Sequence, residues 1–392
     1  MSYNRMVRRL AAVSLLCLAA TNGASAQQQQ RRRDRDGSAS GDGSAGVMTA
    51  GKHRSLGEVA LSERRFDDAM SHYREAIKME PGVAANHYKL YRVHNRMRRL
   101  SDALTDLTNA LEIEPNGVDY RKQRALILVN LGQCDRAVED YKELKRLGAD
   151  DAKWKDAETE AVRCAAEVGA AMKAYMSEEW EAAVQYFGMA LSHMESAADL
   201  TYMKARAEYK VEDYYGTISD TGRVLKSHPK HLDAYQLRGE AYFRLGEHDM
   251  AVKHFREALK LDPEHSGCKA GHKAVKNITK KEKRGDDAYG RGEKKEAINH
   301  WRQAMEADPT HLAFILPMRL KVSGALSEIG EHAEAIKEAV AHIVFQESAD
   351  GLIALADAEL SAEQYEDAVL TLRKAVNFEV KITLHISAVP VR

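Results

Sequence analysis

The sequence contains few residues that interrupt helices and no excess of either charge. Its 392 residues include only 7 prolines, and before residue 378 no run of segments alternates apolar and polar residues as strands do. Lysine plus arginine number 58 and aspartate plus glutamate 59. This balance argues against a nucleic-acid partner, because nucleic-acid-binding proteins usually carry a strong basic excess. Abundant Ala, Leu, Glu, Lys and Arg instead favour an all-α protein.

Motifs that carry catalytic chemistry are also missing. The chain has no phosphate-binding P-loop, no G-x-S-x-G, no H-E-x-x-H and no cysteine pair at zinc spacing. The 16 histidines are scattered, and His248 and His254 lie six residues apart rather than four. We expect both on a solvent-facing side of a helix. The sequence therefore predicts no catalytic residue, no metal site and no cofactor, and places function in a binding surface.

A small residue recurs along the chain with a period close to 34. It stands at Ala69, Ala103, Ala137, Ala183, Thr217, Ala251, Ala297, Ala335 and Ala368. The steps between these positions are 34, 34, 46, 34, 34, 46, 38 and 33 residues. In most units a second small residue follows seven positions later, with an aromatic residue or leucine between the two, as at Tyr73 and Ala76. Such a pattern is typical of the tetratricopeptide repeat.

The pattern has a direct physical interpretation. Two antiparallel helices pack closely only where small side chains meet at their crossing, and large residues such as Phe66, Tyr73 and Trp180 then fill the space between units. Proline stops the second helix of five units twelve residues after the small residue, because it lacks an N–H and disfavours helix in the residue before it. These prolines are Pro81, Pro115, Pro229, Pro263 and Pro309. Each unit leaves an apolar face that the next unit covers, so the prediction is a superhelical solenoid of about nine helix-turn-helix repeats with a concave groove.

The two steps of 46 divide the array into three blocks of three repeats. Each step is one repeat plus 12 residues, and the additional residues fall near 149–163 and 264–277. We interpret them as extensions of the first helix of repeats four and seven; flexible loops are the alternative. The predicted blocks are residues 51–150, 151–263 (with its linker helix) and 264–377 (with its linker helix), followed by an atypical tail at 378–392 whose alternating pattern is strand-like.

The N-terminus has the form of a secretory signal. Three arginines precede the apolar stretch Leu10–Ala20, and Ala24-Ser25-Ala26 forms an A-x-A cleavage site. Because the apolar stretch is too short to span a bilayer comfortably, we predict a cleaved signal peptide at 1–26 rather than a membrane anchor. Residues 27–50, rich in Gln, Arg, Gly and Ser, are predicted to be a disordered linker.

Three cysteines remain after Cys17 leaves with the signal, namely Cys134, Cys164 and Cys268. An odd count in an oxidising compartment leaves at least one thiol unpaired. Cys134 occupies the aromatic slot of repeat three and is expected in the core; a disulfide with Cys164 is a second hypothesis. Asn277-Ile278-Thr279 is a sequon, so Asn277 is a possible N-glycosylation site.

The groove residues follow from positions 2, 5, 6, 9, 12 and 13 of each first helix. A carboxylate clamp for a chaperone tail is disfavoured, because Glu58 and Lys89 stand where asparagines are required, although Arg54 occupies the lysine slot. Apolar groove positions indicate an adaptable peptide surface instead, since Met beside aromatic residues can accommodate many shapes. The candidates are Leu61, Tyr88, Leu126, Val129, Met172, Met176, Tyr202, Met203 and Phe243. Packing between helices is the alternative role for these side chains.

A signal, nine repeats and a three-by-three partition together resemble one family. It is the J-domain co-chaperone of the endoplasmic reticulum lumen that carries nine tetratricopeptide repeats, also described as the cellular inhibitor of the double-stranded-RNA-activated kinase. The most specific match is Leu261–Cys268, continuing through His272–Lys276 to Lys280-Lys281, with a weaker match at Ala354–Ala368. The resemblance covers roughly residues 51–377.

This resemblance implies a non-enzymatic co-chaperone of the lumen that binds exposed apolar segments of unfolded secretory proteins, chiefly through its first block. The family hands such clients to a luminal Hsp70 through a J domain, yet the sequence contains no His-Pro-Asp motif. We interpret that as a truncated or mispredicted gene rather than a designed terminus. Ala258 replaces a cysteine frequent in the family, which puts the corresponding disulfide in doubt. A luminal or secreted scaffold for specific folded partners is the alternative function, and kinase inhibition ranks below both.

Overall fold

The computed structural model describes residues 48–149, 154–194 and 196–388. The predicted signal peptide and nearly all of the predicted linker lie outside these residues. Eighteen helices, α2 to α19, make up nine consecutive pairs in this part of the chain. The first helices of the pairs are α2 (Ala50–Ser62), α4 (Ala84–Arg96), α6 (Val118–Asn130), α8 (Lys155–Met176), α10 (Ala198–Lys210), α12 (Leu232–Arg244), α14 (Ser266–Gly290), α16 (Leu312–Glu328) and α18 (Ala349–Ser361). The second helices are α3 (Phe66–Met79), α5 (Leu100–Ile113), α7 (Cys134–Arg146), α9 (Trp180–Leu191), α11 (Tyr214–Ser227), α13 (His248–Leu261), α15 (Lys294–Glu306), α17 (His332–Phe345) and α19 (Tyr365–Ala388).

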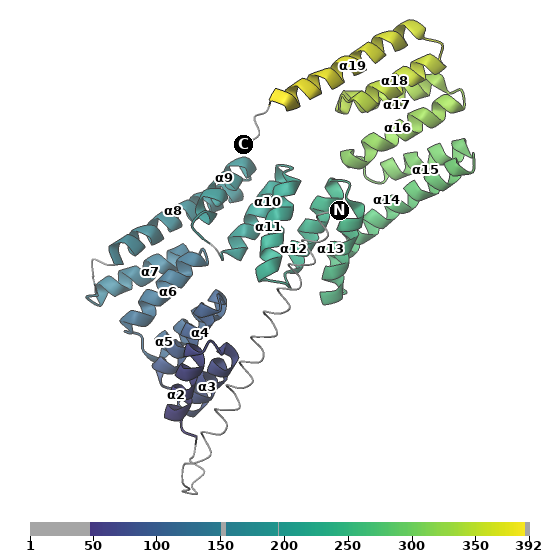
Figure 1. The fold of residues 1–392 in the computed structure, drawn as a ribbon. Helices are drawn as coiled ribbons and strands as arrows, with labels where there is room; N and C mark the ends of the chain where they lie inside the picture. Colours follow the sequence, from purple (N-terminus) through teal and green to yellow (C-terminus); the bar gives the residue numbers. More distant parts are fainter. Residues whose placement is uncertain (1–47, 150–153, 195, 389–392) are drawn as a thin grey trace, which may run out of the picture.

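The helices form a solenoid, as the repeat pattern predicts. Each helix packs against the next one in the sequence, and Figure 1 shows the pairs following one another in a curved row from α2 to α19. No strand occurs in the described residues. Among the described residues, no helix combines the length and the hydrophobicity that a membrane span requires.

The recurring small residue lies at the tightest point of every pair. All nine of these side chains, Ala69 to Ala368, are 0% exposed. The residue four positions later is buried in the first eight repeats, for example at Tyr73 and Phe187, both 0% exposed, and Leu372 of the last repeat is 38% exposed. Because a larger side chain at the crossing would force the helices apart, the small residue sets the distance between the two helices of each repeat.

Proline determines where the second helices end. Helices α3, α5, α11 and α13 each stop two residues before a proline. The last repeat has Val380 at the corresponding place, and α19 continues to Ala388. The prediction of a strand-like tail from residue 378 is therefore wrong as far as residue 388, since a helix that meets no breaker propagates at little cost despite the alternating pattern. Residues 389–392 lie outside the described part.

Both inserts extend first helices, as predicted. Helix α8 has 22 residues and α14 has 25. Apolar clusters continue across both predicted block boundaries: Cys134 shares a cluster with Phe187, and Phe243 shares one with Trp301. The division into three blocks remains a prediction.

Each repeat turns between its two helices through one residue in the left-handed region. That residue stands five positions before the small residue in all nine repeats. It is glycine in four of them and Arg64, Arg98, Glu178, Glu212 or Glu363 in the others, with φ between 58° and 63°. Glycine adopts this conformation freely, whereas other L-residues are strained by about 1 to 2 kcal/mol.

We expect Glu178→Gly to stabilise the protein by about 0.5 to 1 kcal/mol, because it removes this strain from an exposed turn. The matched change is Gly292→Ala, where nothing lies within 4 Å of an added Cβ and φ is +81°. It should destabilise by about 1 kcal/mol. Urea unfolding followed by circular dichroism measures both. Two changes of the same sign would contradict the strain argument.

The end of α12 and the start of α13 pack against the start of α16, far along the chain. Arg244 contacts Asp308 at 3.0 Å, and the Nε2 atoms of His248 and His311 lie 3.1 Å apart. The ring of His311 also packs on Phe243, with centroids 4.3 Å apart. Burial lowers the pKa of His311 to about 4. His248 therefore belongs to an interface rather than to a solvent-facing side, contrary to the prediction.

His254 is likewise buried. Its ring stacks on Tyr242 at 5.2 Å with an interplanar angle of 4°, and only 9% of the residue is exposed. Burial, aided by the nearby positive charges of Arg238 and Lys253, lowers the pKa of His254 to about 4. The expectation of a solvated histidine is wrong because the ring of His254 packs against those of Tyr235 and Tyr242, both on α12 of the same repeat.

Stability should fall as the pH drops from 6.5 towards 4. In this window the unfolded chain binds protons at His254 and His311, whereas the folded chain keeps both histidines neutral. Each histidine therefore lowers the free energy of unfolding by about 1.4 kcal/mol for every unit by which the pH falls. His254→Phe should reduce the slope of the unfolding free energy against pH by about that amount. The control is His228→Phe at an exposed histidine. An unchanged slope in His254→Phe would refute the assignment.

Candidate peptide-binding surfaces

The concave face of the first three repeats is less open to a peptide than its sequence implies. Leu61 is only 1% exposed and packs with Met70 and Tyr73, so it belongs to the core. Its position near the end of α2 faces the next helix rather than the groove. Tyr88, Leu126 and Val129 are partly exposed. The Tyr88 ring contacts that of Tyr120 at 5.1 Å.

Ion pairs occupy much of this face. Glu58 on α2 accepts hydrogen bonds from Lys89 at 2.6 Å and Arg92 at 2.9 Å, both on α4. Burial works against the ionised carboxylate, but the hydrogen bond from Lys89 and the charges of Lys89 and Arg92 hold the pKa of Glu58 below its ordinary value. Glu58 is thus neutralised by two cations and does not present the free negative charge that the sequence implied.

The predicted residues of the middle repeats are spread over different environments. Met176 is 75% exposed, whereas Met172 and Met203 pack against the core cluster that contains Phe187. The ring of Tyr202 lies 4.7 Å from that of His231. Phe243 is only 8% exposed, because α16 covers it. The structure therefore does not bring the nine predicted groove residues together, and Leu61 and Phe243 are corrected to core positions.

Cys134 and Cys164 lie at the junction of α7 and α8. Their Cα atoms are 5.7 Å apart and the two sulfur atoms are bonded. Cys268 is a free thiol that is 0% exposed, and burial raises its pKa to about 11. Asn277 is exposed on α14. Among the described residues, no group of three or more His, Cys, Asp or Glu side chains is placed to hold a metal ion.

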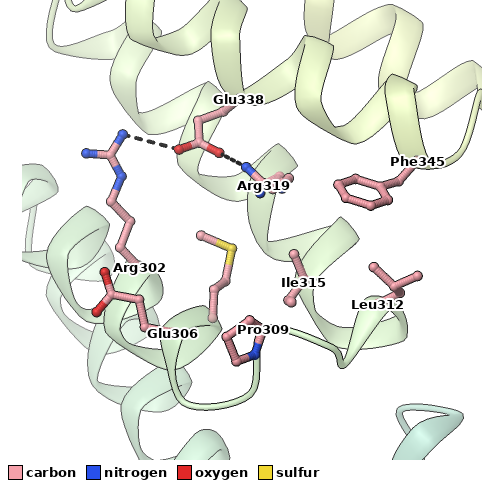
Figure 2. A pocket seen from close by; sticks show the side chains of 9 residues that line it. Arg302, Glu306, Pro309, Leu312, Ile315, Arg319, Glu338 and Phe345 are labelled. Atoms are coloured by element: carbon pink, nitrogen blue, oxygen red, sulfur yellow. Dashed lines mark hydrogen bonds and ion pairs between the residues drawn. The ribbon is translucent and has the colours of Figure 1, made fainter.

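An apolar pocket that sequence reasoning missed lies between α15, α16 and α17. It has a volume of about 350 Å³ and is walled by Met305, Pro309, Leu312, Ile315 and Phe345. Figure 2 shows Phe345, Leu312 and Ile315 facing one another across one side of the opening. An apolar side chain of a peptide would fit a space of this size and lining.

The other side of the pocket is polar and tightly paired. Glu338 is 9% exposed and bridges two guanidinium groups, at 3.2 Å from Arg302 and 2.6 Å from Arg319 (Figure 2). The bridge joins three helices, because Arg302 lies on α15, Arg319 on α16 and Glu338 on α17. It therefore fixes the spacing of the pocket walls.

Exposed apolar side chains continue outward from the pocket. Phe345 is 61% exposed and Val344 76%, and Leu312 and Val340 are 44% and 42% exposed. Exposed apolar residues that gather in one place mark interaction sites more often than those that are scattered. The rule of concave positions missed them because three of the four lie on a second helix. The only signal in the sequence was the apolar run Ala339-Val340-Ala341 and Ile343-Val344-Phe345, which exceeds what one buried helix face requires.

Comparisons with known proteins agree with the fold. The tetratricopeptide repeat family matches residues 232–265, which contain α12 and α13. A crystal structure of the P58(IPK) TPR domain superposes with a TM-score of 0.64 at 22% sequence identity, covering 87% of this chain and 99% of that one. This likeness supports the solenoid architecture.

Curated relatives share part of the sequence. The DnaJ protein P58IPK homolog B of Oryza sativa subsp. japonica is 28% identical over 266 residues, which cover 67% of this chain and 56% of the relative. DnaJ homolog subfamily C member 3 of Homo sapiens is 25% identical over 232 residues, covering 58% of this chain and 46% of the relative. The chain is similar to these P58IPK and DnaJ subfamily C member 3 proteins over part of their length. It spans about half the length of the curated relatives it matches.

Removal of the bond between Cys134 and Cys164 should destabilise the protein by about 3 kcal/mol, because the bond closes a loop of about 30 residues in the unfolded chain. The measurement is urea unfolding of Cys134→Ser/Cys164→Ser beside the parent with and without dithiothreitol. Reductant should lower the stability of the parent and leave the double variant unchanged. A parent insensitive to reductant would contradict the prediction.

Proposed function

We propose that this chain is a non-enzymatic co-chaperone that holds exposed apolar segments of unfolded secretory proteins. The observation that carries the proposal is the open apolar pocket of α15, α16 and α17, lined by Leu312 and Phe345 and followed by the exposed Val344 next to Phe345 in the sequence, on a chain whose relatives bear the names of DnaJ proteins. Partly exposed Tyr88, Leu126 and Met176 would add contacts on the concave side. Leu61 and Phe243 are buried and take no part in the proposed binding of clients.

The energetics favour weak and reversible binding. Burial of about 300 Å² of apolar surface yields about 7 kcal/mol at roughly 25 cal/mol per Å². Loss of translational and conformational freedom offsets much of this gain. A client would therefore be held long enough to prevent aggregation and released without an input of energy.

We place this activity in the lumen of the endoplasmic reticulum, in support of the unfolded-protein response. Support comes from the form of residues 1–26 as a secretory signal and from the bond between Cys134 and Cys164, since disulfides persist in oxidising compartments. A luminal Hsp70 is the proposed recipient of the clients. Transfer to it would require a J domain, and the 392 residues hold no His-Pro-Asp motif.

A scaffold that assembles specific folded partners is the alternative function. The ion-paired concave face of α2 and α4 favours it, because charged pairs at fixed positions discriminate between partners better than they hold generic apolar segments. A scaffold would bind one defined sequence tightly, whereas a co-chaperone would bind many apolar sequences weakly.

The test is suppression of aggregation of a chemically denatured client by residues 27–392. We expect Leu312→Ser/Val344→Ser/Phe345→Ser to lose at least half of the suppression, because these changes remove the apolar rim of the pocket. All three side chains are exposed, so the variant should keep its helical circular dichroism.

A control variant changes three other exposed apolar residues, Val162→Ser/Met189→Ser/Tyr215→Ser. It should suppress aggregation as well as the parent. No suppression by the folded parent would overturn the co-chaperone function and leave the scaffold. Equal loss in both triple variants would show that the pocket is not the client site.

A further inference from the structure

A second groove runs along α14 and shares Pro309 with the pocket of Figure 2. Its volume is about 760 Å³, and α14 forms one wall while the turn between α15 and α16 forms the other. The residues that line it are Ala270, Lys273, Ala274, Lys276, Asn277, Ile278, Lys280, Ala307, Asp308 and Pro309.

The groove exists because α14 is longer than its partner. Helix α14 has 25 residues and α15 has 13, and α15 ends at Glu306. The first half of α14 therefore has no second helix of its own repeat alongside it, and the turn that follows α15 closes the space only at its end. In a repeat without the extension, the second helix would lie along the whole first helix, and this groove would be absent.

The rim of the groove carries uncompensated positive charge. Lys273, Lys276 and Lys280 are exposed, and none of them makes an ion pair within the described part of the chain. Asp308 is the one acidic side chain in the lining, and it is held by Arg244 at 3.0 Å and by the hydroxyl of Thr310 at 2.7 Å. The groove thus presents three cations to a partner and no free carboxylate.

The floor of the groove is apolar. Its apolar lining consists of Ala270, Ala274 and Ile278 on α14 and Pro309 in the turn, and of these Ile278 is only 2% exposed. Lys273 and Lys280 are seven residues apart, which is about 10 Å along a helix. An extended peptide rises about 3.3 Å per residue and points alternate side chains to opposite sides. Carboxylates at every second residue could therefore meet the lysines while the residues between them contact the floor.

We propose that this groove binds an acidic segment of a partner polypeptide in which carboxylates alternate with apolar residues. The site shares only Pro309 with the apolar pocket, and it does not depend on the proposed co-chaperone function. A bilayer fits less well, because a flat surface would reach the lysines but not the recessed floor. Single-stranded nucleic acid fits less well too, because no aromatic side chain lines the groove to stack on a base.

The test measures fluorescence anisotropy of a labelled eight-residue peptide of alternating Glu and Leu. Lys273→Glu/Lys276→Glu/Lys280→Glu should weaken its binding at least tenfold. The matched control is Lys78→Glu/Lys260→Glu/Lys337→Glu, which makes the same change in net charge at lysines that are 71%, 69% and 73% exposed on second helices. It should change binding less than twofold. The protein is made without glycosylation, because Asn277 lines the groove and a glycan there would cover it.

Further arms separate the kinds of partner. Replacement of Glu by Gln, or of Leu by Ser, in the peptide should each weaken binding at least fivefold, because charge and floor contacts are both required. Equal loss in the two lysine variants, or undiminished binding of the Ser peptide, would reduce the groove to a general positive surface and overturn the proposal. Binding of an RNA oligonucleotide, or of vesicles that contain phosphatidylserine, without binding of the peptide would also overturn the proposal. Aggregation suppression should be unaffected by the groove variant, which keeps this test independent of the co-chaperone test.

Discussion

The close crossing of two helices at a side chain no larger than threonine is the constraint on which the rest of the structure depends. Nine such crossings, each completely shielded from solvent, set the distance between the helices of every repeat. Once that distance is set, the larger residue one turn later has a defined space to fill, and the next repeat must cover it. Curvature, groove and surface all follow from the repetition of this contact.

The extended helices α8 and α14 interrupt the regular array and create surfaces that the other repeats lack. In a regular array each helix meets only its neighbours, but the length of α14 brings the turn before α16 against the end of α12. His311 and Phe243 are buried at this contact, and Asp308 of the same turn also lines the groove beside α14. One turn thus takes part in a core contact and in the proposed binding groove.

Charge is distributed differently over the two sides of the solenoid. On α2 and α4 the cations are matched to Glu58, so the concave side of the first repeats is polar but nearly neutral. On α14, Lys273, Lys276 and Lys280 make no ion pair within the described residues, and between α15 and α17 the paired Arg302, Arg319 and Glu338 support an apolar opening. Net charge close to zero for the whole chain therefore conceals local surfaces of distinct character.

The sequence by itself determined the helical class, the period, the ends of the helices that precede a proline and the burial of the small residues. These properties depend on contacts between residues that are close in the sequence, and the pattern repeats often enough to be recognised. Extension of α8 and α14 also followed from the sequence, since two inserts of equal length in helix-forming stretches keep the register.

The tertiary structure alone decided which apolar residues are exposed. Leu61 and Phe243 occupy concave positions by count, yet both are buried, while Val344 and Phe345 lie on a second helix and are exposed. Position within a repeat does not by itself give exposure, because Leu61 near the end of α2 faces the next helix and the start of α16 covers Phe243. Contacts between residues more than 60 positions apart, such as Arg244 with Asp308, leave no periodic trace, because they arise from the superhelix rather than from the repeat.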